Sequence, residues 1–348
     1  MVPDDVRGGR RFVAAEVLSP SALSAPFPGV VWDTSVDAVL DSYRATFGVV
    51  TQLIVDSSSG AAARTVHSDE YVDFILEGSD LELDEPSFPL YFVRREDAVF
   101  TKPTSYLGRH TGYFFDEVTR ATPEVCRSAL LGAATALRAG EWVSSGASGE
   151  VRMGLAVCRP PGHHAFPGFG GGLCIFANAA IAARALKESG TVAVLDLDAD
   201  HGNGTQAVFY GDPDVLTVSL HAEGWPWVSG FREEIGSGVG RGKNLNLPLP
   251  RGSAGAQYLP AFDLAIEAIR DFAPSSLVIA LGCDSHEGQS TPWINLSTGD
   301  FNYIGNQLGS LELPTVVTTE GCYGYESTLA ASGAFFAGWR SAIDRELG

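Results

Sequence analysis

The chain of 348 residues lacks features that would place it in several classes of protein. No apolar run reaches the length of about 18 residues that a membrane-spanning helix needs, so we expect no membrane association. Its first residues, MVPDDVRGGRRFVAAEV, hold no apolar segment before a cleavage site, and no secretory signal is predicted. No internal repeat or low-complexity segment divides the chain. These absences favour a globular protein of the cytoplasm.

Basic residues and paired cysteines are also scarce. The chain has 23 Lys and Arg against 42 Asp and Glu, which gives a net charge of −19. Phosphate binding needs basic patches, so nucleic acid is not expected as a partner. The negative field would attract a cationic substrate, although solubility alone also explains the charge. The odd count and the absence of a CxxC pair predict reduced thiols rather than a disulfide frame for Cys126, Cys158, Cys174, Cys283 and Cys322.

The most informative stretch is VAVLDLDADHGNGTQAVFY, residues 192–210. Four apolar residues predict a buried strand, and Asp196, Asp198 and Asp200 follow at alternate positions. Residues two apart share a face of an extended chain, so the carboxylates are predicted to line up where α/β sheets bind ligands. Like charges so close need a cation between them or protonation. The segment therefore predicts a metal site, and a solvated acidic turn fits the flanking apolar runs less well.

The rest of the chain alternates between short apolar strands and amphipathic helices. This alternation predicts an α/β fold in three layers, with a mostly parallel central sheet and helices on both faces, in a single domain over residues 1–348. The predicted strands are Val151–Val157, Val192–Asp198, Val215–His221, Leu277–Cys283 and Thr315–Thr319. The predicted helices are Asp37–Phe47, His67–Leu76 capped by Ser68, Ala121–Gly140 capped by Thr122, Leu173–Glu188, Ala256–Phe272, Asp300–Leu308 and Ser327–Glu346.

Polar motifs follow the ends of these strands. They are RPPGHHA (159–165), GFGGGLCIFANAAIAA (168–183), DLDADHGNGTQAVFY (196–210), TVSLHAEG (217–224), GRGKNLNLPLPRG (240–252), LGCDSHEG (281–288) and EGCY (320–323). In order and spacing they resemble the arginase/deacetylase superfamily, specifically the histone deacetylases and acetylpolyamine amidohydrolases. HGNGTQ is more similar to the acetylpolyamine and general bacterial branch. The resemblance implies the arginase/deacetylase fold and a zinc-dependent hydrolysis of acylated amines.

The resemblance also implies roles for individual residues. Asp198 and Asp284 match two of the three zinc ligands of the family. The implied catalytic residues are the tandem histidines His163 and His164, which act on the water, Asp196 and Asn203 behind them, and Tyr323, which binds the carbonyl oxygen. Phe169 and Gly172 match the wall of the acyl-lysine tunnel. A structural potassium site is implied at Asp196, Asp198 and Ser219, with carbonyl groups near Asp200 and Leu220.

The implied chemistry is sound on its own terms. A Lewis acid activates both a poorly electrophilic amide carbonyl and a poorly nucleophilic water. A histidine can take the proton of the water near neutral pH and return it to the leaving amine. A tyrosine hydroxyl can donate to the oxyanion, which is worth roughly 3 kcal/mol for one donor.

The main departure from the family is Asp200, which stands where the third zinc ligand is a histidine. With Asp198 and Asp284 it would form an oxygen-only site, and such sites favour Mn²⁺, Mg²⁺ or Ca²⁺ over zinc. Three hypotheses follow: zinc is kept and amides are hydrolysed, another ion such as Mn²⁺ or Fe²⁺ supports a different C–N bond reaction, or the metal is lost and the protein only binds a ligand. The retained histidines and Tyr323 count against the last hypothesis.

Further departures affect the substrate and the assembly. Pro26-Phe27-Pro28 replaces a His-Pro-Glu element, and Gln289-Ser290-Thr291 replaces an acidic residue and proline. Trp225 and Trp227 could form an apolar rim, and residues 77–105 could be the insertion through which relatives form homodimers. His221 and His286 are predicted to be structural. The sequence therefore favours a metal-dependent amidohydrolase that acts on a small acylated amine, such as an acetylpolyamine or an N-acyl metabolite. A histone-directed role lacks a supporting basic region.

Overall fold

The computed structural model describes residues 6–7, 10–18, 35–48, 50–55, 59–81, 104–110, 112–116, 118–147, 150–224, 229–290 and 293–346. The expectations for Pro26-Phe27-Pro28, for Trp225 and Trp227, and for most of residues 77–105 lie outside these ranges. No helix in the described ranges has the length and apolarity that crossing a membrane requires.

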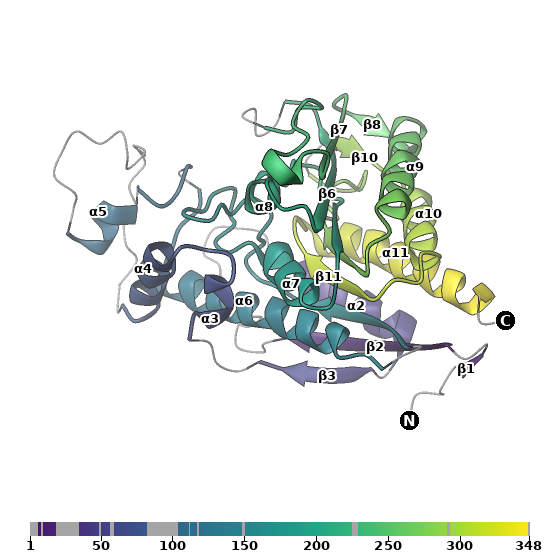
Figure 1. Ribbon diagram of the computed structural model, residues 1–348, viewed down its shortest axis with the longest axis horizontal. Helices are drawn as coiled ribbons and strands as arrows, with labels where there is room; N and C mark the ends of the chain where they lie inside the picture. Colours follow the sequence, from purple (N-terminus) through teal and green to yellow (C-terminus); the bar gives the residue numbers. More distant parts are fainter. Residues whose placement is uncertain are drawn as a thin grey trace.

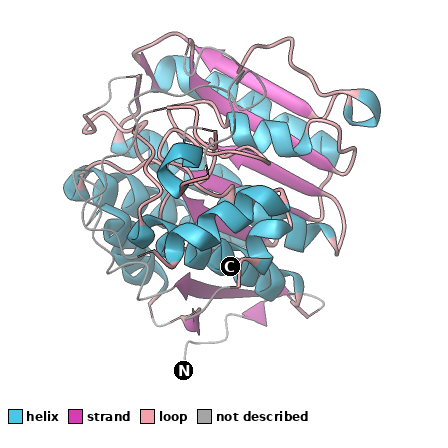
Figure 2. Cartoon of the chain, turned by 90° about the vertical axis from the view of Figure 1, so that its left-hand side faces the viewer, coloured by secondary structure: helices cyan, strands magenta, loops and turns pink. Residues whose placement is uncertain are grey.

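The described part of the chain is built around one nine-stranded sheet (Figure 1, Figure 2). Its order is β1-β2-β4-β11-β9-β5-β6-β7, and β3 also pairs with β2. Every pairing in this sheet is parallel except that of β1 with β2. The strands are β1 Val6–Arg7, β2 Arg10–Leu18, β3 Thr51–Ile54, β4 Glu150–Ala156, β5 Val192–Asp196, β6 Val215–Ala222, β7 Asn244–Leu249, β9 Ser276–Leu281 and β11 Thr315–Thr319. The short strands β8 Ser253–Ala254 and β10 Ile294–Asn295 pair separately.

Helices cover both faces of this sheet, as predicted. The helices are α2 Ser35–Phe47, α3 Ala61–Arg64, α4 Asp69–Ser79, α5 Tyr106–His110, α6 Pro123–Ser144, α7 Asn178–Lys187, α8 Asn203–Phe209, α9 Gly255–Phe272, α10 Thr298–Gly309 and α11 Tyr325–Glu346. Alternate strand residues enter different cores. Ala193 and Leu195 of β5 pack with α2, α9, α10 and α11, whereas Val192 and Val194 pack with α3, α4, α6 and α7. The predicted three-layer α/β architecture is therefore confirmed.

Helix capping explains where several of these helices begin. The Ser68 side chain accepts a hydrogen bond from the N–H of Tyr71 at the start of α4, and Thr122 caps α6 in the same way, with Pro123 in its first turn. Both caps were predicted from the sequence. The predicted end of α6 at Gly140 is wrong, because the helix continues to Ser144. Gly140 is needed there for close packing, since a Cβ atom would lie 2.7 Å from the Ala182 carbonyl oxygen.

Most other predicted boundaries differ by one to three residues, and two of the differences bear on the site. The helix predicted from Leu173 begins only at Asn178, because Leu173 has a left-handed backbone with φ of 69°. Strand β5 ends at Asp196, so Asp198 and Asp200 lie in the turn beyond it rather than on an extended strand. The alternate spacing of the aspartates therefore predicted the correct edge of the sheet. The expected extended backbone is wrong, because the strand has already ended at Asp196.

The N-terminal and C-terminal segments pack against each other. Helix α2 lies along α11, and the hydroxyl groups of Ser42 and Ser332 are 2.7 Å apart. The N–H of Gly324 donates to the Ser35 hydroxyl at 2.9 Å. Ser35, the first residue of α2, is therefore hydrogen-bonded to the loop that follows β11.

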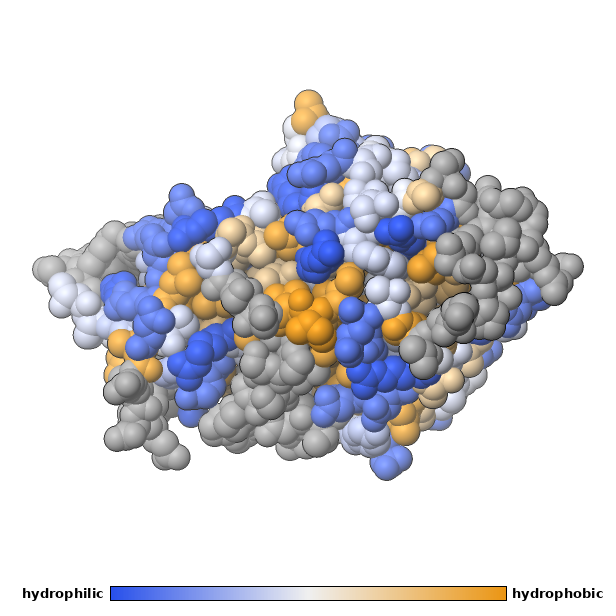
Figure 3. All heavy atoms as spheres, turned by 90° about the horizontal axis from the view of Figure 1, so that it is seen from below, coloured by the Kyte–Doolittle hydropathy of each residue, from blue (hydrophilic) through white to orange (hydrophobic). Residues whose placement is uncertain are grey.

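Figure 3 shows the molecule from below the view of Figure 1. Apolar residues gather near the centre of this face, between hydrophilic ones.

Candidate functional site

Three carboxylates meet at the carboxyl ends of β5 and β9, which are parallel neighbours in the sheet. One ligand atom each from Asp198, Asp200 and Asp284 lies within 4.8 Å of the others. Backbone groups fix two of them, because Gly321 N–H donates to Asp198 Oδ2 at 2.8 Å and Ala199 N–H donates to Asp284 Oδ1 at 3.0 Å. We call these three aspartates the carboxylate group. They are the residues predicted as metal ligands.

The electrostatics of the carboxylate group fit a divalent cation. Burial, followed by the charge of Asp198, raises the pKa of Asp200 to about 7. Burial and the charges of Asp198 and Asp200 raise the pKa of Asp284 well above its usual value. The Oδ1 atom of Asp200 is buried without a hydrogen-bond partner. An unpartnered oxygen among mutually repelling carboxylates is the environment that a bound cation stabilises. The donor set is all oxygen, which suits hard cations and is also accepted by zinc.

His201 does not replace the missing imidazole ligand, although it follows Asp200 directly. Its Nδ1 atom lies 2.9 Å from the Ser229 hydroxyl, and its Nε2 atom lies 3.1 Å from Asn246 Oδ1. Both ring nitrogens are therefore used within the protein. His221 is similar, since it bonds to the Ser219 hydroxyl and donates to the Gly230 carbonyl. These two rings pack against each other with centroids 4.6 Å apart.

The tandem histidines lie beside the carboxylate group and have different partners. His163 Nδ1 is 3.1 Å from Asp196 Oδ2, and its Nε2 atom is 3.8 Å from Asp198 Oδ1. His164 Nδ1 donates to Asn203 Oδ1 at 2.8 Å. The structure thus pairs one histidine with a carboxylate and the other with a neutral amide, as the sequence suggested.

These partners give the two histidines opposite pKa shifts. Burial lowers the pKa of His163, but the charges of Asp198, Asp196 and Glu320 outweigh burial and raise it well above the usual value. Burial and the neighbouring His163 lower the pKa of His164 to about 3. Of the two histidines, His163 therefore has by far the higher affinity for a proton, and His164 stays neutral.

Tyr323 follows β11 close to the same carboxylates. Burial, and then the charges of Asp284 and Asp198, raise the pKa of its phenol well above the usual value, so it is a hydrogen-bond donor at neutral pH. The loop that carries it is held by Gln289, whose side-chain oxygen accepts from the N–H of Tyr323 at 3.0 Å. The sequence had marked Gln289 only as a departure from the family pattern.

The two predicted tunnel residues have different surroundings. Gly172 packs against a tandem histidine, because a Cβ atom there would lie 2.3 Å from Cδ2 of His164. Phe169 stacks on Phe166 with centroids 4.6 Å apart. The turn at Gly172 is clamped by Asp116, whose carboxylate accepts from the N–H of Gly172 at 2.5 Å. No local sequence pattern indicated Asp116, because its role depends on a contact between distant segments.

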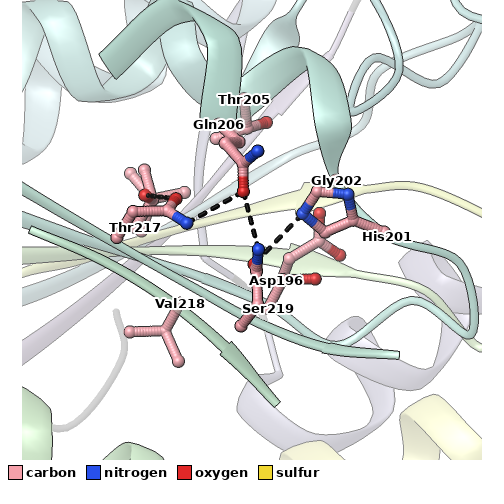
Figure 4. Close-up of a pocket in the computed structure, with 11 residues that line it drawn as sticks. Asp196, His201, Gly202, Thr205, Gln206, Thr217, Val218 and Ser219 are labelled. Atoms are coloured by element: carbon pink, nitrogen blue, oxygen red, sulfur yellow. Dashed lines mark hydrogen bonds between the residues drawn. The ribbon is translucent and has the colours of Figure 1, made fainter. Parts of the chain in front are cut away.

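Two of the side chains predicted to hold potassium, Asp196 and Ser219, line a small cavity, whereas Asp198 does not belong to its lining (Figure 4). Asp196 of β5 faces Ser219 of β6 in register, and both line this cavity. Asn246 joins His201 to the amide oxygen of Gln206 on its other side. The buried Thr205 hydroxyl, also in the lining, has no hydrogen-bond partner. The cavity has a volume of about 10 Å³, which is room for about one water-sized group, and potassium stays a prediction.

The parallel sheet and the polar groups at its carboxyl edge define an α/β protein with a candidate metal site, which agrees with the family resemblance of its motifs. The comparison with family models agrees, since the histone deacetylase domain matches residues 34–338. The chain therefore belongs to the histone deacetylase domain family.

Several of the relatives are bacterial proteins named acetylpolyamine amidohydrolase. The chain is 43% identical over 217 residues to the acetylpolyamine amidohydrolase of Burkholderia pseudomallei (strain 1710b), and the aligned part spans 61% of this chain and 62% of that protein. It is 36% identical over 275 residues to acetylpolyamine amidohydrolase 1 of Pseudomonas aeruginosa, and the aligned part spans 75% of this chain and 78% of that protein. A crystal structure of acetylpolyamine aminohydrolase from Burkholderia pseudomallei superposes with a TM-score of 0.84 at 32% identity, covering 95% of this chain and 99% of that one.

Proposed function

We propose that the protein is a metal-dependent amidohydrolase that removes an acetyl-type group from a small acylated amine, with an acetylpolyamine as the first candidate. The observation that carries this proposal is the position of His163, His164 and Tyr323 around the carboxylate group at one edge of the sheet. The names of the relatives support the substrate class. Residues 1–348 would act as one catalytic domain.

Asp198, Asp200 and Asp284 would hold the metal, with zinc as the first candidate and Mn²⁺ or Fe²⁺ as alternatives. A bound divalent cation supplies Lewis acidity, which polarises an amide carbonyl and lowers the pKa of water. Its charge would also offset that of Asp198, which is the largest of the charges that raise the pKa of His163.

His163 is the proposed general base. Its Nδ1–H donates to Asp196, so its Nε2 atom is the one that can take a proton from the attacking water. Asp196 then stabilises the imidazolium, which returns the proton to the leaving amine. His164 donates through Nδ1 to Asn203, so its Nε2 atom can accept a hydrogen bond from the water and orient it. Because burial and the neighbouring His163 lower its pKa to about 3, His164 remains neutral through this cycle.

Tyr323 is the proposed donor to the oxyanion of the tetrahedral intermediate, since its phenol keeps its proton at neutral pH. Gly172 packs so closely against His164 that no side chain would fit there, and we propose that Gly172 and Phe169 form part of the wall of the substrate tunnel. Potassium behind Asp196 would reinforce the edge of the sheet. A homodimer and a cytoplasmic location are retained as predictions.

The first experiment is to measure bound metals in protein purified without chelator, together with turnover of an acetylated polyamine, for the native chain and for Asp200→His. About one divalent ion per chain with turnover supports the proposal, and the metal found identifies the cofactor. A native chain without metal or turnover, together with an Asp200→His variant that gains zinc, would overturn it in favour of a ligand-binding protein.

The all-oxygen donor set favours one alternative, which is a different C–N bond reaction with a harder cation. Manganese or iron in the native chain, without release of acetate from any acylated amine, would support this alternative.

A further inference from the structure

A buried carboxylate contacts the backbone of the tandem histidines. Glu320 follows β11 and is only 1% exposed. Its Oε2 atom accepts hydrogen bonds from the N–H groups of Gly162 at 2.7 Å and His163 at 3.0 Å. The Thr318 hydroxyl donates to Oε1 at 3.3 Å. One carboxylate oxygen thus binds two consecutive amides, the second of which belongs to the proposed general base.

Three separate contacts hold His163 in place. Its ring Nδ1 lies 3.1 Å from Asp196, and its carbonyl accepts from the N–H groups of Gly204 at 2.9 Å and Thr205 at 3.2 Å, at the start of α8. Its N–H is held by Glu320. The ring, the carbonyl and the amide are therefore anchored to β5, α8 and the segment after β11 respectively, and each anchor limits a different rotation of the residue.

Burial raises the pKa of the Glu320 carboxyl to about 7, whereas the hydrogen bond from the Gly162 N–H favours its charged form. When Glu320 is ionised, both N–H groups donate to a charged acceptor, and such hydrogen bonds are shorter and stronger than neutral ones. The arrangement is therefore suited to a segment that must be held rigidly. The segment held here presents His163 Nε2 toward the carboxylate group, 3.8 Å from Asp198 Oδ1.

We propose that Glu320 is a positioning residue, which fixes the Gly162–His163 backbone and thereby aims the imidazole of His163 at the reacting water. This inference rests on the proposed amidohydrolase function. Removal of the acceptor would leave two buried N–H groups without a partner, and the segment would turn to satisfy them. A misplacement of about 1 Å at a catalytic group costs roughly 100-fold in rate.

Two substitutions test the proposal. Glu320→Ala removes the acceptor, and we expect kcat to fall about 100-fold while KM changes by less than about threefold. Glu320→Gln keeps an amide oxygen for both N–H groups, so it should recover most of the lost kcat. The control is Glu16→Ala, which removes another buried carboxylate, bonded to Arg44 and Gln52 far from the site. It should lower the melting temperature but leave kcat unchanged.

A second readout does not depend on turnover. Hydrogen exchange of the peptide spanning residues 159–166 should speed up at two amides in Glu320→Ala, those of Gly162 and His163, and should stay slow in Glu320→Gln and Glu16→Ala. Unchanged exchange in folded Glu320→Ala would overturn the anchoring, as would an equal loss of kcat in both Glu320 variants. If the exchange changes as expected but the native protein hydrolyses no acylated amine, the proposed function fails and the anchoring stands.

Discussion

Adjacent residues serve different parts of the site, and Asp200 and His201 are the clearest case. The Asp200 carboxylate faces Asp198 and Asp284, whereas the His201 ring bonds to Ser229 and Asn246. Turning His201 toward the carboxylate group would break two buried hydrogen bonds, each worth about 1 kcal/mol. We therefore keep Asp200 as the proposed ligand at the family position, because a one-residue slip of the chain would not bring His201 to the carboxylate group.

The tyrosine gives the sharpest prediction for a single side chain. Tyr323→Phe removes only the phenol oxygen, and we expect kcat for an acetylated amine to fall about 100-fold with little change in KM, because the donor acts on the oxyanion. Steady-state kinetics measures both constants. Tyr325→Phe is a matched control, since the hydroxyl of Tyr325 donates to Asp41 at the surface. Equal kinetics for the two variants would remove Tyr323 from the proposed mechanism.

At the scale of elements, the sequence predicted what depends on local pattern. Helices α4 and α6 begin at caps that the chain itself provides, and the four apolar residues that open β5 are buried as predicted. Strand β2 was missed because it contains a charged residue, Glu16, which is buried against Arg44 from α2. Asp116 and Glu320 acquire their contacts only through distant segments. The sequence alone could place the polar motifs at one edge of the sheet. It could not predict the hydrogen bonds to Asp116 and Glu320 that fix these motifs, because they join segments far apart in the chain.

His67 connects two such elements and should make stability sensitive to acid. Its Nδ1–H donates to the Phe166 carbonyl, and its Nε2 accepts from the N–H of Ala177, which joins the α3–α4 turn to the segment before α7. Burial lowers its pKa to about 4. The folded state then binds the proton less tightly than the unfolded chain, so this stability is complete above about pH 6.5 and is lost as the pH falls toward 4.

His67→Gln should remove the part of the pH dependence of the free energy of unfolding that arises from His67. Urea unfolding at pH 7.5 and pH 5.0 should show that the native chain loses about 2 kcal/mol more than the variant between the two values. The variant will be less stable at pH 7.5 if Gln does not restore both hydrogen bonds, but the comparison uses only the difference between the two pH values. The same loss in both proteins would mean that His67 contributes nothing to the acid sensitivity.

For the whole molecule, the net charge of −19 sets the long-range field. If the substrate is an acetylated polyamine, its remaining ammonium groups will be drawn to the protein at low salt. We expect kcat/KM for such a substrate to fall about tenfold from 10 to 300 mM salt, because the field is screened. An uncharged N-acetyl amine of similar length is the control and should show little change. Parallel salt dependence for the two substrates would contradict electrostatic attraction of the amine.

The pairing of α2 with α11 has a consequence for how the protein is made. The Ser42 hydroxyl contacts Ser332, and Ser35 binds the loop that carries Tyr323, so these contacts of α2 cannot form until residues 324–332 have left the ribosome. Contacts between residues so distant in sequence form slowly during folding. The apolar face of α2 therefore stays without α11 as a partner until residues 325–346 have been translated, and the edge of the sheet that carries the candidate site is completed only after β11 has been translated. We expect a chain truncated before α11 to expose the apolar face of α2 and to bind chaperones or aggregate, and not to fold into an enzyme of reduced activity.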